Sequence, residues 1–147
     1  LSLAAAKATI EELRDKNVPK FLDDQGKKLK DGYNSIVNKL GLDFTKTIGY
    51  NWRSMATFDE NAGDPLIQKS LMQQEMIKRG VLWQGFHNMS FSHSDADVEY
   101  TLQALEESLL ILKKVVQENK LKESLRGIPV QPVFRKVDNF NMKPVKK

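Results

Sequence analysis

The apolar positions of the first fifteen residues are spaced as on one face of a helix: Leu3, Ala6, Ile10 and Leu13. Ser2 precedes this stripe, so we predict a helix with Ser2 as its N-cap that ends at Arg14 or Asp15. The chain thus starts inside a helical pattern and without an initiator methionine. This start predicts either a processed N-terminus or a fragment of a longer protein.

A second, longer helix is predicted after residues 17–19 (NVP), because proline is tolerated in the first turn of a helix. One face of this helix carries the apolar residues Leu22, Leu29, Tyr33, Ile36, Val37 and Leu40. Gly41 follows, and glycine readily adopts the left-handed conformation that ends many helices. We therefore predict two consecutive helices, the second ending at Gly41.

The hydrophobic period changes in residues 44–59 (FTKTIGYNWRSMATFD), which are rich in β-branched and aromatic side chains. The alternation places Trp52, Ser54, Ala56 and Phe58 on one face and Arg53, Met55 and Thr57 on the other. Gly49 interrupts the run, so we predict a short strand, a bend at Gly49 and a second strand. Both tryptophans of the chain, Trp52 and Trp83, are predicted to be core aromatics.

A third helix is predicted from Asp64-Pro65, an N-cap followed by proline at the first helical position, to Gly80. Its expected buried face holds Ile67, Leu71, Gln74 and Ile77. Residues 81–92 (VLWQGFHNMSFS) form the next extended segment, which Gly85 interrupts. This segment supplies the last strand of the predicted sheet.

Residues 94–97 (SDAD) match the capping-box pattern, a hydroxyl with an acid three residues later. A long apolar stripe follows and predicts the final helix: Leu102, Leu105, Leu109, Leu112 and Val116. From residue 127 the chain contains three prolines and no regular period. We predict an irregular extension there.

The predicted order is helix–helix–strand–strand–helix–strand–helix. It indicates an α+β fold with a small, mostly antiparallel sheet of three to four strands covered by about four helices. The sequence shows no internal repeat and no linker within the body. We expect one domain over residues 1–126 and an extension over 127–147.

Composition excludes some classes of function. The chain has no cysteine, which rules out disulfides and thiolate metal sites and is compatible with a cytoplasmic location. Its net charge of +4 is spread over mixed-charge segments, so we expect no nucleic-acid binding. No apolar run reaches the ~20 residues that a membrane-spanning helix needs.

The two histidines, His87 and His93, invite a catalytic hypothesis because histidine titrates near neutral pH. Metal binding needs more ligands, and the nearby Asp95 and Asp97 already suit a helix N-terminus. We therefore interpret His93 as part of a strand-to-helix junction. The chain contains no GxSxG, GxGxxG or phosphate-binding loop, so we predict no catalytic, cofactor or metal site within it.

Arg53 is the most informative polar residue of the strand-rich segments. Its planar guanidinium can bind a carboxylate or a phosphate through two parallel hydrogen bonds. The alternative is an ordinary exposed arginine on a strand.

Four segments resemble, in the right order and with the right gaps, the C-terminal small domain of class III pyridoxal-phosphate-dependent aminotransferases: residues 1–15, 18–42, 71–83 and 89–109. The last includes the sequence HSDAD, similar to the H-T/S-x-x-D helix start of the family. The resemblance covers residues 1–116, and its nearest branch is that of glutamate-1-semialdehyde aminomutase-like enzymes.

The resemblance implies a parent enzyme of fold type I, a homodimer in which a separate large domain holds pyridoxal phosphate. The cofactor lysine, the aspartate facing the pyridine nitrogen and the phosphate-binding residues would lie in that missing large domain. The resemblance therefore implies that this segment binds no cofactor itself. The parent would transfer or shift an amino group on a small carbonyl or amino substrate.

One departure from the family pattern concerns residues 81–94. Many class III aminotransferases have an arginine there that binds a substrate carboxylate, and this sequence has none; His87 and Asn88 occupy that neighbourhood. The departure favours the aminomutase-like branch or an unusual amino acceptor. The resemblance implies that strands of the small domain approach the substrate, which makes Arg53 and Asn88 our candidates for residues near it. A stand-alone α+β module that binds a protein or a ligand without catalysis remains the alternative hypothesis.

Overall fold

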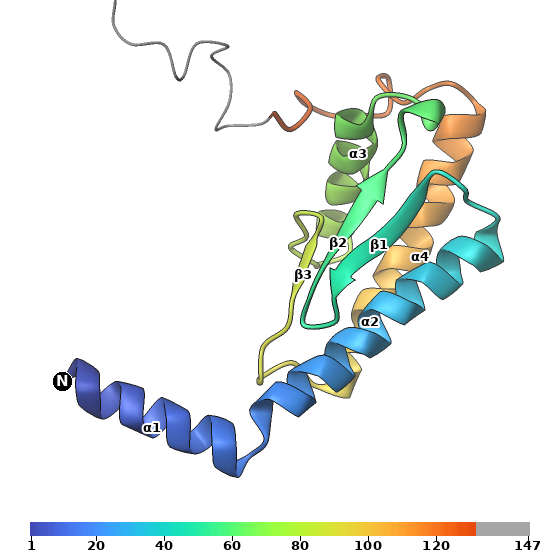
Figure 1. Cartoon of the computed structure of the whole chain (residues 1–147). Coiled ribbons are helices and arrows are strands. Elements are labelled where there is room, and N and C mark those ends of the chain that lie inside the picture. Colours follow the sequence, from blue (N-terminus) through green and yellow to red (C-terminus); the bar gives the residue numbers. More distant parts are fainter. Residues whose placement is uncertain (132–147) are drawn as a thin grey trace, which may run out of the picture.

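The computed structural model describes residues 1–131 (Figure 1). Its elements are α1 (Ser2–Asp15), α2 (Val18–Leu40), β1 (Thr45–Tyr50), β2 (Arg53–Phe58), the short 3₁₀ helix η1 (Glu60–Ala62), α3 (Pro65–Lys78), β3 (Phe86–Asn88) and α4 (Asp95–Gln117). Apart from η1, this is the predicted order. The predicted α+β class is confirmed, with four α-helices and a three-stranded sheet within the described residues.

The sheet is antiparallel throughout, in the order β1-β2-β3. Tyr50 pairs with Arg53, so the β1–β2 turn consists of Asn51 and Trp52. The predicted bend at Gly49 is wrong, because Gly49 lies inside β1 with φ +96°. A side chain there would place its Cβ 2.9 Å from the Arg53 carbonyl oxygen, so glycine permits the close pairing of the two strands.

One face of the sheet is covered and the other is open (Figure 1). Helices α2 and α3 contact the sheet, and α4 packs against both helices. Residues pointing toward the helices are buried: Thr45, Thr47, Ser54, Ala56 and His87. Their neighbours along the strands are exposed and form what we call the open face: Lys46, Ile48, Tyr50, Arg53, Met55, Phe86 and Asn88.

The core lies between the sheet and the helices. The predicted stripe of α4 is confirmed, since Leu105, Leu109 and Leu112 have no exposed surface. The predicted face of α3 is partly wrong: Ile77 is 51% exposed, whereas Met76 is fully buried. Helix α3 contacts both β2 and α4, so its buried positions do not form the single stripe that one contact face would predict.

That segment is attached to α3 through side chains. The Gln74 amide donates to the Ser124 carbonyl at 3.1 Å and accepts from the Arg126 N–H at 2.9 Å. The Ser70 hydroxyl accepts from the Val130 N–H. Residues 127–131 have no regular structure. The rest of the predicted extension, 132–147, lies outside the described residues.

Helix α1 projects away from the body and buries none of its residues (Figure 1). Asn17, in the left-handed conformation at φ 48°, separates it from α2. The predicted N-cap role of Ser2 is wrong, because Ser2 is already helical and Leu1 is the N-cap. Within the described part of the chain, no helix has both the length and the apolar character needed to cross a membrane.

Candidate functional site

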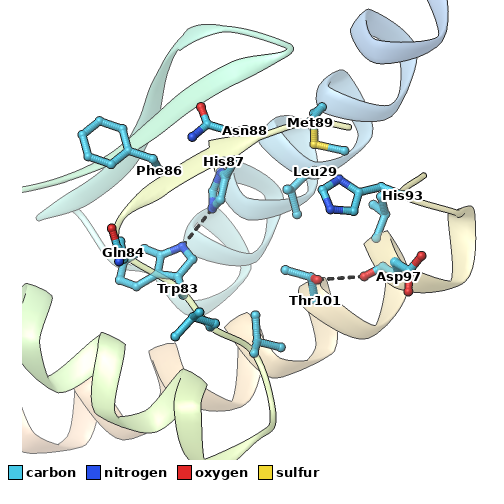
Figure 2. A pocket seen from close by; sticks show the side chains of 13 residues that line it. Leu29, Trp83, Gln84, Phe86, His87, Asn88, Met89, His93, Asp97 and Thr101 are labelled. Atoms are coloured by element: carbon cyan, nitrogen blue, oxygen red, sulfur yellow. Dashed lines mark hydrogen bonds between the residues drawn. The ribbon is translucent and has the colours of Figure 1, made fainter. Parts of the chain in front are cut away.

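His87 lies on β3 and points into the core, where it is 5% exposed (Figure 2). The Trp83 indole N–H can only donate, so His87 Nε2 accepts from it at 3.1 Å. The proton of the neutral ring is then on Nδ1, which donates to Ser54 Oγ at 3.0 Å. Burial lowers the pKa of His87 to about 4. His87 is therefore a neutral, fully hydrogen-bonded core residue rather than a general base.

His93 lies in the tight turn before α4. Its Nδ1 accepts the backbone N–H of Ser90 at 3.1 Å. Ser94 Oγ accepts from the Asp97 N–H, and Asp97 in return accepts from the Ser94 N–H at 2.8 Å. The predicted capping box is thus confirmed. Hydrogen bonds from the Ser94 side chain and backbone lower the pKa of Asp97, which keeps its charge at the positive end of α4.

A cleft of about 390 Å³ opens between β3 and the first turns of α4 (Figure 2). Its lining includes Leu29, Trp83, His87, Met89, His93 and Thr101. Pyridoxal phosphate needs a lysine amine for its imine and donors for its phosphate. No lysine or arginine lines the cleft, so its residues do not fit that cofactor. Among the described residues, no cluster of three potential metal ligands forms either.

The structure brings the two predicted substrate-proximal residues together. Arg53 on β2 is the direct cross-strand partner of Asn88 on β3, and both side chains are exposed on the open face. Such neighbours have Cβ atoms roughly 4.5–5.5 Å apart. Within residues 1–131, neither side chain makes an intramolecular hydrogen bond or ion pair. Both are therefore available to bind something outside this segment.

Apolar side chains surround this polar pair. Ile48, Met55 and Phe86 form the next cross-strand row of the open face. Lys69 Nζ lies 5.6 Å from the centre of the Phe86 ring and adds a cation at this edge of the sheet. The alternation of the sequence predicted exposure of Met55, but nothing in it indicated that Lys69 and Phe86 would meet.

The two tryptophans differ in environment. Trp83 is 2% exposed, which confirms it as a core aromatic. Trp52 is 46% exposed, so its predicted core position is wrong. The reason is that Trp52 belongs to the two-residue turn, where the alternation of the strand does not apply. Its ring stacks on Tyr50 instead, with the ring centres 4.9 Å apart and the planes within 6°.

Comparisons with known proteins relate this segment to aminotransferases. No protein-family model matches the chain. The chain is 27% identical over 119 residues to 3-aminobutyryl-CoA aminotransferase of Cloacimonas acidaminovorans (strain Evry), covering 78% of this chain and 28% of that protein.

Two solved structures share the fold. An omega-transaminase from Sphaerobacter thermophilus superposes with a TM-score of 0.57 at 15% identity. The match covers 63% of this chain and 24% of the omega-transaminase chain. The PLP internal aldimine form of the FumI protein of Sphingopyxis sp. MTA144 gives a TM-score of 0.53 at 24% identity. The match covers 68% of this chain and 23% of the FumI chain.

The chain therefore spans only 28% of the length of the curated relative that it matches. Nothing in the comparisons singles out the aminomutase-like branch. At the level of the aminotransferases, the resemblance noted in the sequence is confirmed by both the sequence match and the shared fold. The described part of the chain thus resembles part of an aminotransferase in sequence and shares its fold with domains of two transaminase-type structures.

Proposed function

We propose that this chain is the small domain of a class III, pyridoxal-phosphate-dependent aminotransferase or aminomutase. The enzyme transfers or shifts an amino group on a small carbonyl or amino substrate. The observation that carries the proposal is an aminotransferase-like fold whose open sheet face presents Arg53 and Asn88 side by side, without partners among the described residues.

The cofactor belongs to the rest of the longer protein in this proposal. Pyridoxal phosphate would supply the electron sink of the reaction when bound there. The lining of the cleft between β3 and α4 does not suit the cofactor. The proposed longer protein includes a large domain, which holds the cofactor, and it forms a homodimer.

Arg53 is the proposed contact to an anionic group of the substrate. Its guanidinium can form two parallel hydrogen bonds, which fix orientation as well as charge. Ser54 on the same strand is buried against His87, which keeps the backbone beside Arg53 in place. Asn88, across the strand pair, adds a neutral donor and acceptor next to the guanidinium. The pair thus suits a carboxylate or a phosphate.

The identity of the substrate is a further part of the proposal. The curated relative is named for a coenzyme A thioester of an amino acid, and we include acyl thioesters among the candidate substrates. The lack of an arginine within residues 81–94 supports an amino acceptor other than 2-oxoglutarate.

Steady-state kinetics of the full-length enzyme test the role of Arg53. Arg53→Lys keeps the charge and removes the planar fork, so the test separates geometry from attraction. We expect kcat/KM for an anionic substrate to fall ten-fold or more, since such a contact contributes about 1.5–3 kcal/mol. Lys46→Arg, at the far end of the open face, is the matched control and should leave kcat/KM unchanged. An unchanged value in Arg53→Lys would make Arg53 an ordinary surface residue.

A spectroscopic experiment tests whether the cofactor binds outside this 147-residue chain. The isolated 147-residue chain, mixed with pyridoxal phosphate, should show no stoichiometric absorption band of an internal imine. A band that borohydride reduction fixes on a single lysine would contradict the proposal. The full-length protein should show such a band. If the full-length protein shows neither the band nor amino transfer, the alternative of a non-catalytic binding module is favoured, with the open face as its contact surface.

A further inference from the structure

The tip of the β1–β2 hairpin carries an exposed aromatic pair. Tyr50 is 70% exposed and Trp52 46% exposed, although their rings stack nearly in parallel. Stacking covers only one face of each ring. Large aromatic side chains gain stability from burial, so an exposed stacked pair that contributes nothing to the core calls for a partner from outside the segment.

The tip is held rigidly against α2. Gly26 packs so closely on the turn that a Cβ there would lie 2.0 Å from the Asn51 carbonyl oxygen. The Asn51 amide donates to Asp23 at 2.9 Å, and Lys30 Nζ donates to the Gly49 carbonyl at 2.7 Å. The aromatic pair is therefore preorganised, and a ligand would lose little of its binding energy to ordering the site.

The charge of the tip is positive on the exposed side. The three strands contain Lys46 and Arg53 and no aspartate or glutamate. Arg53 follows Trp52 directly and pairs with Tyr50 across the hairpin. A carboxylate reaches the tip from α2, where Asp23 accepts the hydrogen bond from Asn51. The guanidinium of Arg53, which has no ion-pair partner within residues 1–131, thus lies next to the two aromatic residues in the hairpin.

We propose that this tip binds a nucleotide, with the base stacked on the Tyr50–Trp52 pair and a phosphate held by Arg53. A ligand with only a carboxylate would leave the rings unused, and an apolar partner would bury the arginine unpaired. A nucleotide suits both the aromatic pair and the arginine, because its base has a flat π-surface and its phosphate accepts two parallel hydrogen bonds. The inference deepens the proposed function by naming the anion at Arg53, but binding itself does not depend on amino transfer.

The two tryptophans make the test direct. In a ¹H–¹⁵N spectrum of the 147-residue chain, each indole N–H gives one signal, and Trp52→Phe identifies the signal of Trp52. Titration with ADP should shift that signal and leave the signal of the buried Trp83 in place. The unshifted Trp83 signal also shows that the core stays folded in each variant. No ADP-dependent shift of Trp52 up to the solubility limit of the nucleotide would overturn the proposal.

Variants and probe ligands separate the two contacts. Arg53→Gln should weaken ADP binding about ten-fold and leave the weaker binding of adenosine unchanged. Tyr50→Ala should weaken both about ten-fold, because the base loses its platform. Lys46→Gln, which removes one charge from the far end of the open face, is the matched control and should change neither. The proposal fails if Lys46→Gln weakens ADP binding as much as Arg53→Gln does. It also fails if pyrophosphate shifts the Trp52 signal as far as ADP does, because the surface would then attract anions without a specific site.

A final titration distinguishes the sources of the nucleotide. Coenzyme A carries the same adenine and phosphate groups as ADP. Tighter binding of coenzyme A would assign the site to a nucleotide-bearing carrier, and equal binding would assign it to the nucleotide alone; both outcomes support the proposal. Nucleotide binding by this chain would stand even if the full-length protein transferred no amino group, so the two proposals can fail separately.

Discussion

The two faces of the sheet are built from alternate residues of the same three strands and behave in opposite ways. On the covered face, the Thr45 hydroxyl bonds to the Tyr33 hydroxyl at 2.7 Å, and the Thr47 hydroxyl donates to the Lys30 carbonyl at 3.1 Å. On the open face, Arg53 and Asn88 find no side-chain partner in the described chain. The polar groups of the covered face form internal hydrogen bonds, whereas those of the open face are available to ligands or partners.

This difference shows why residue type alone is a poor guide to function in this molecule. His87 has the side chain most often used in catalysis, yet both its nitrogens are occupied in the core. Arg53 lies one residue before Ser54, the partner of His87, and points the opposite way. A shift of one position along a strand changes a structural residue into a candidate for binding.

The largest expected contrast is between the two tryptophans. Trp83→Ala should reduce the free energy of unfolding by about 3–5 kcal/mol, because it empties a buried volume and leaves His87 without its donor. Trp52→Ala should cost about 1 kcal/mol, the stacking with Tyr50. Urea unfolding followed by circular dichroism measures both. Equal losses would mean that the hairpin tip is as tightly packed as the core.

Acid should weaken the covered face through His87. Burial holds its pKa at about 4, below the ordinary 6.5, so the unfolded chain binds a proton that the folded chain does not. This contribution to stability is complete above pH 6.5 and falls as the pH drops toward 4, by about 3 kcal/mol in total. Urea unfolding at a series of pH values should show this slope.

The matched controls for this pH dependence are the two histidine variants. His87→Gln should remove the slope between pH 6.5 and 4 and lower stability at neutral pH. His93→Gln should keep the slope, because it leaves His87 buried. A slope that persists in His87→Gln would assign the acid sensitivity to other groups.

The hairpin tip should be sensitive to its contact with α2. Gly26→Ala places a methyl group 2.0 Å from the Asn51 carbonyl oxygen. This carbonyl is part of the β1–β2 turn, so it can move away only if the whole turn moves. We expect a loss of about 1–3 kcal/mol, the usual range for overpacking. Gly127→Ala is the control, because a Cβ there meets nothing within 4 Å. A neutral Gly26→Ala would show that the tip is not fixed on α2.

The smallest expected effect concerns the junction before α4. Ser94→Ala should destabilise the fold by about 1 kcal/mol through loss of the N-cap. His93→Ala should cost less, because its hydrogen bond to the Ser90 N–H lies in an exposed turn. If His93→Ala in the full-length enzyme instead abolished turnover without changing the melting temperature, the structural role assigned to this junction would be wrong.

Local rules of the sequence were sufficient for the order of the elements and for most of their ends. The capping box at residues 94–97, Pro65 after Asp64 and the left-handed Gly41 all follow from chemistry within a few residues. The apolar stripe of α4 was equally clear. These features depend on neighbours in the chain, so a sequence can specify them without knowledge of the fold.

Tertiary structure decided what the period of the strands left open. The sequence separated Arg53 from Ser54 by alternation, but the pairing of Arg53 with Asn88 depends on a register between residues 35 positions apart. Likewise, Trp52 is exposed because the turn falls at residues 51–52, and His87 is inert because Trp83 and Ser54 reach its two nitrogens. Hydrogen bonds and packing between distant segments fix these positions, and no short stretch of sequence contains both partners.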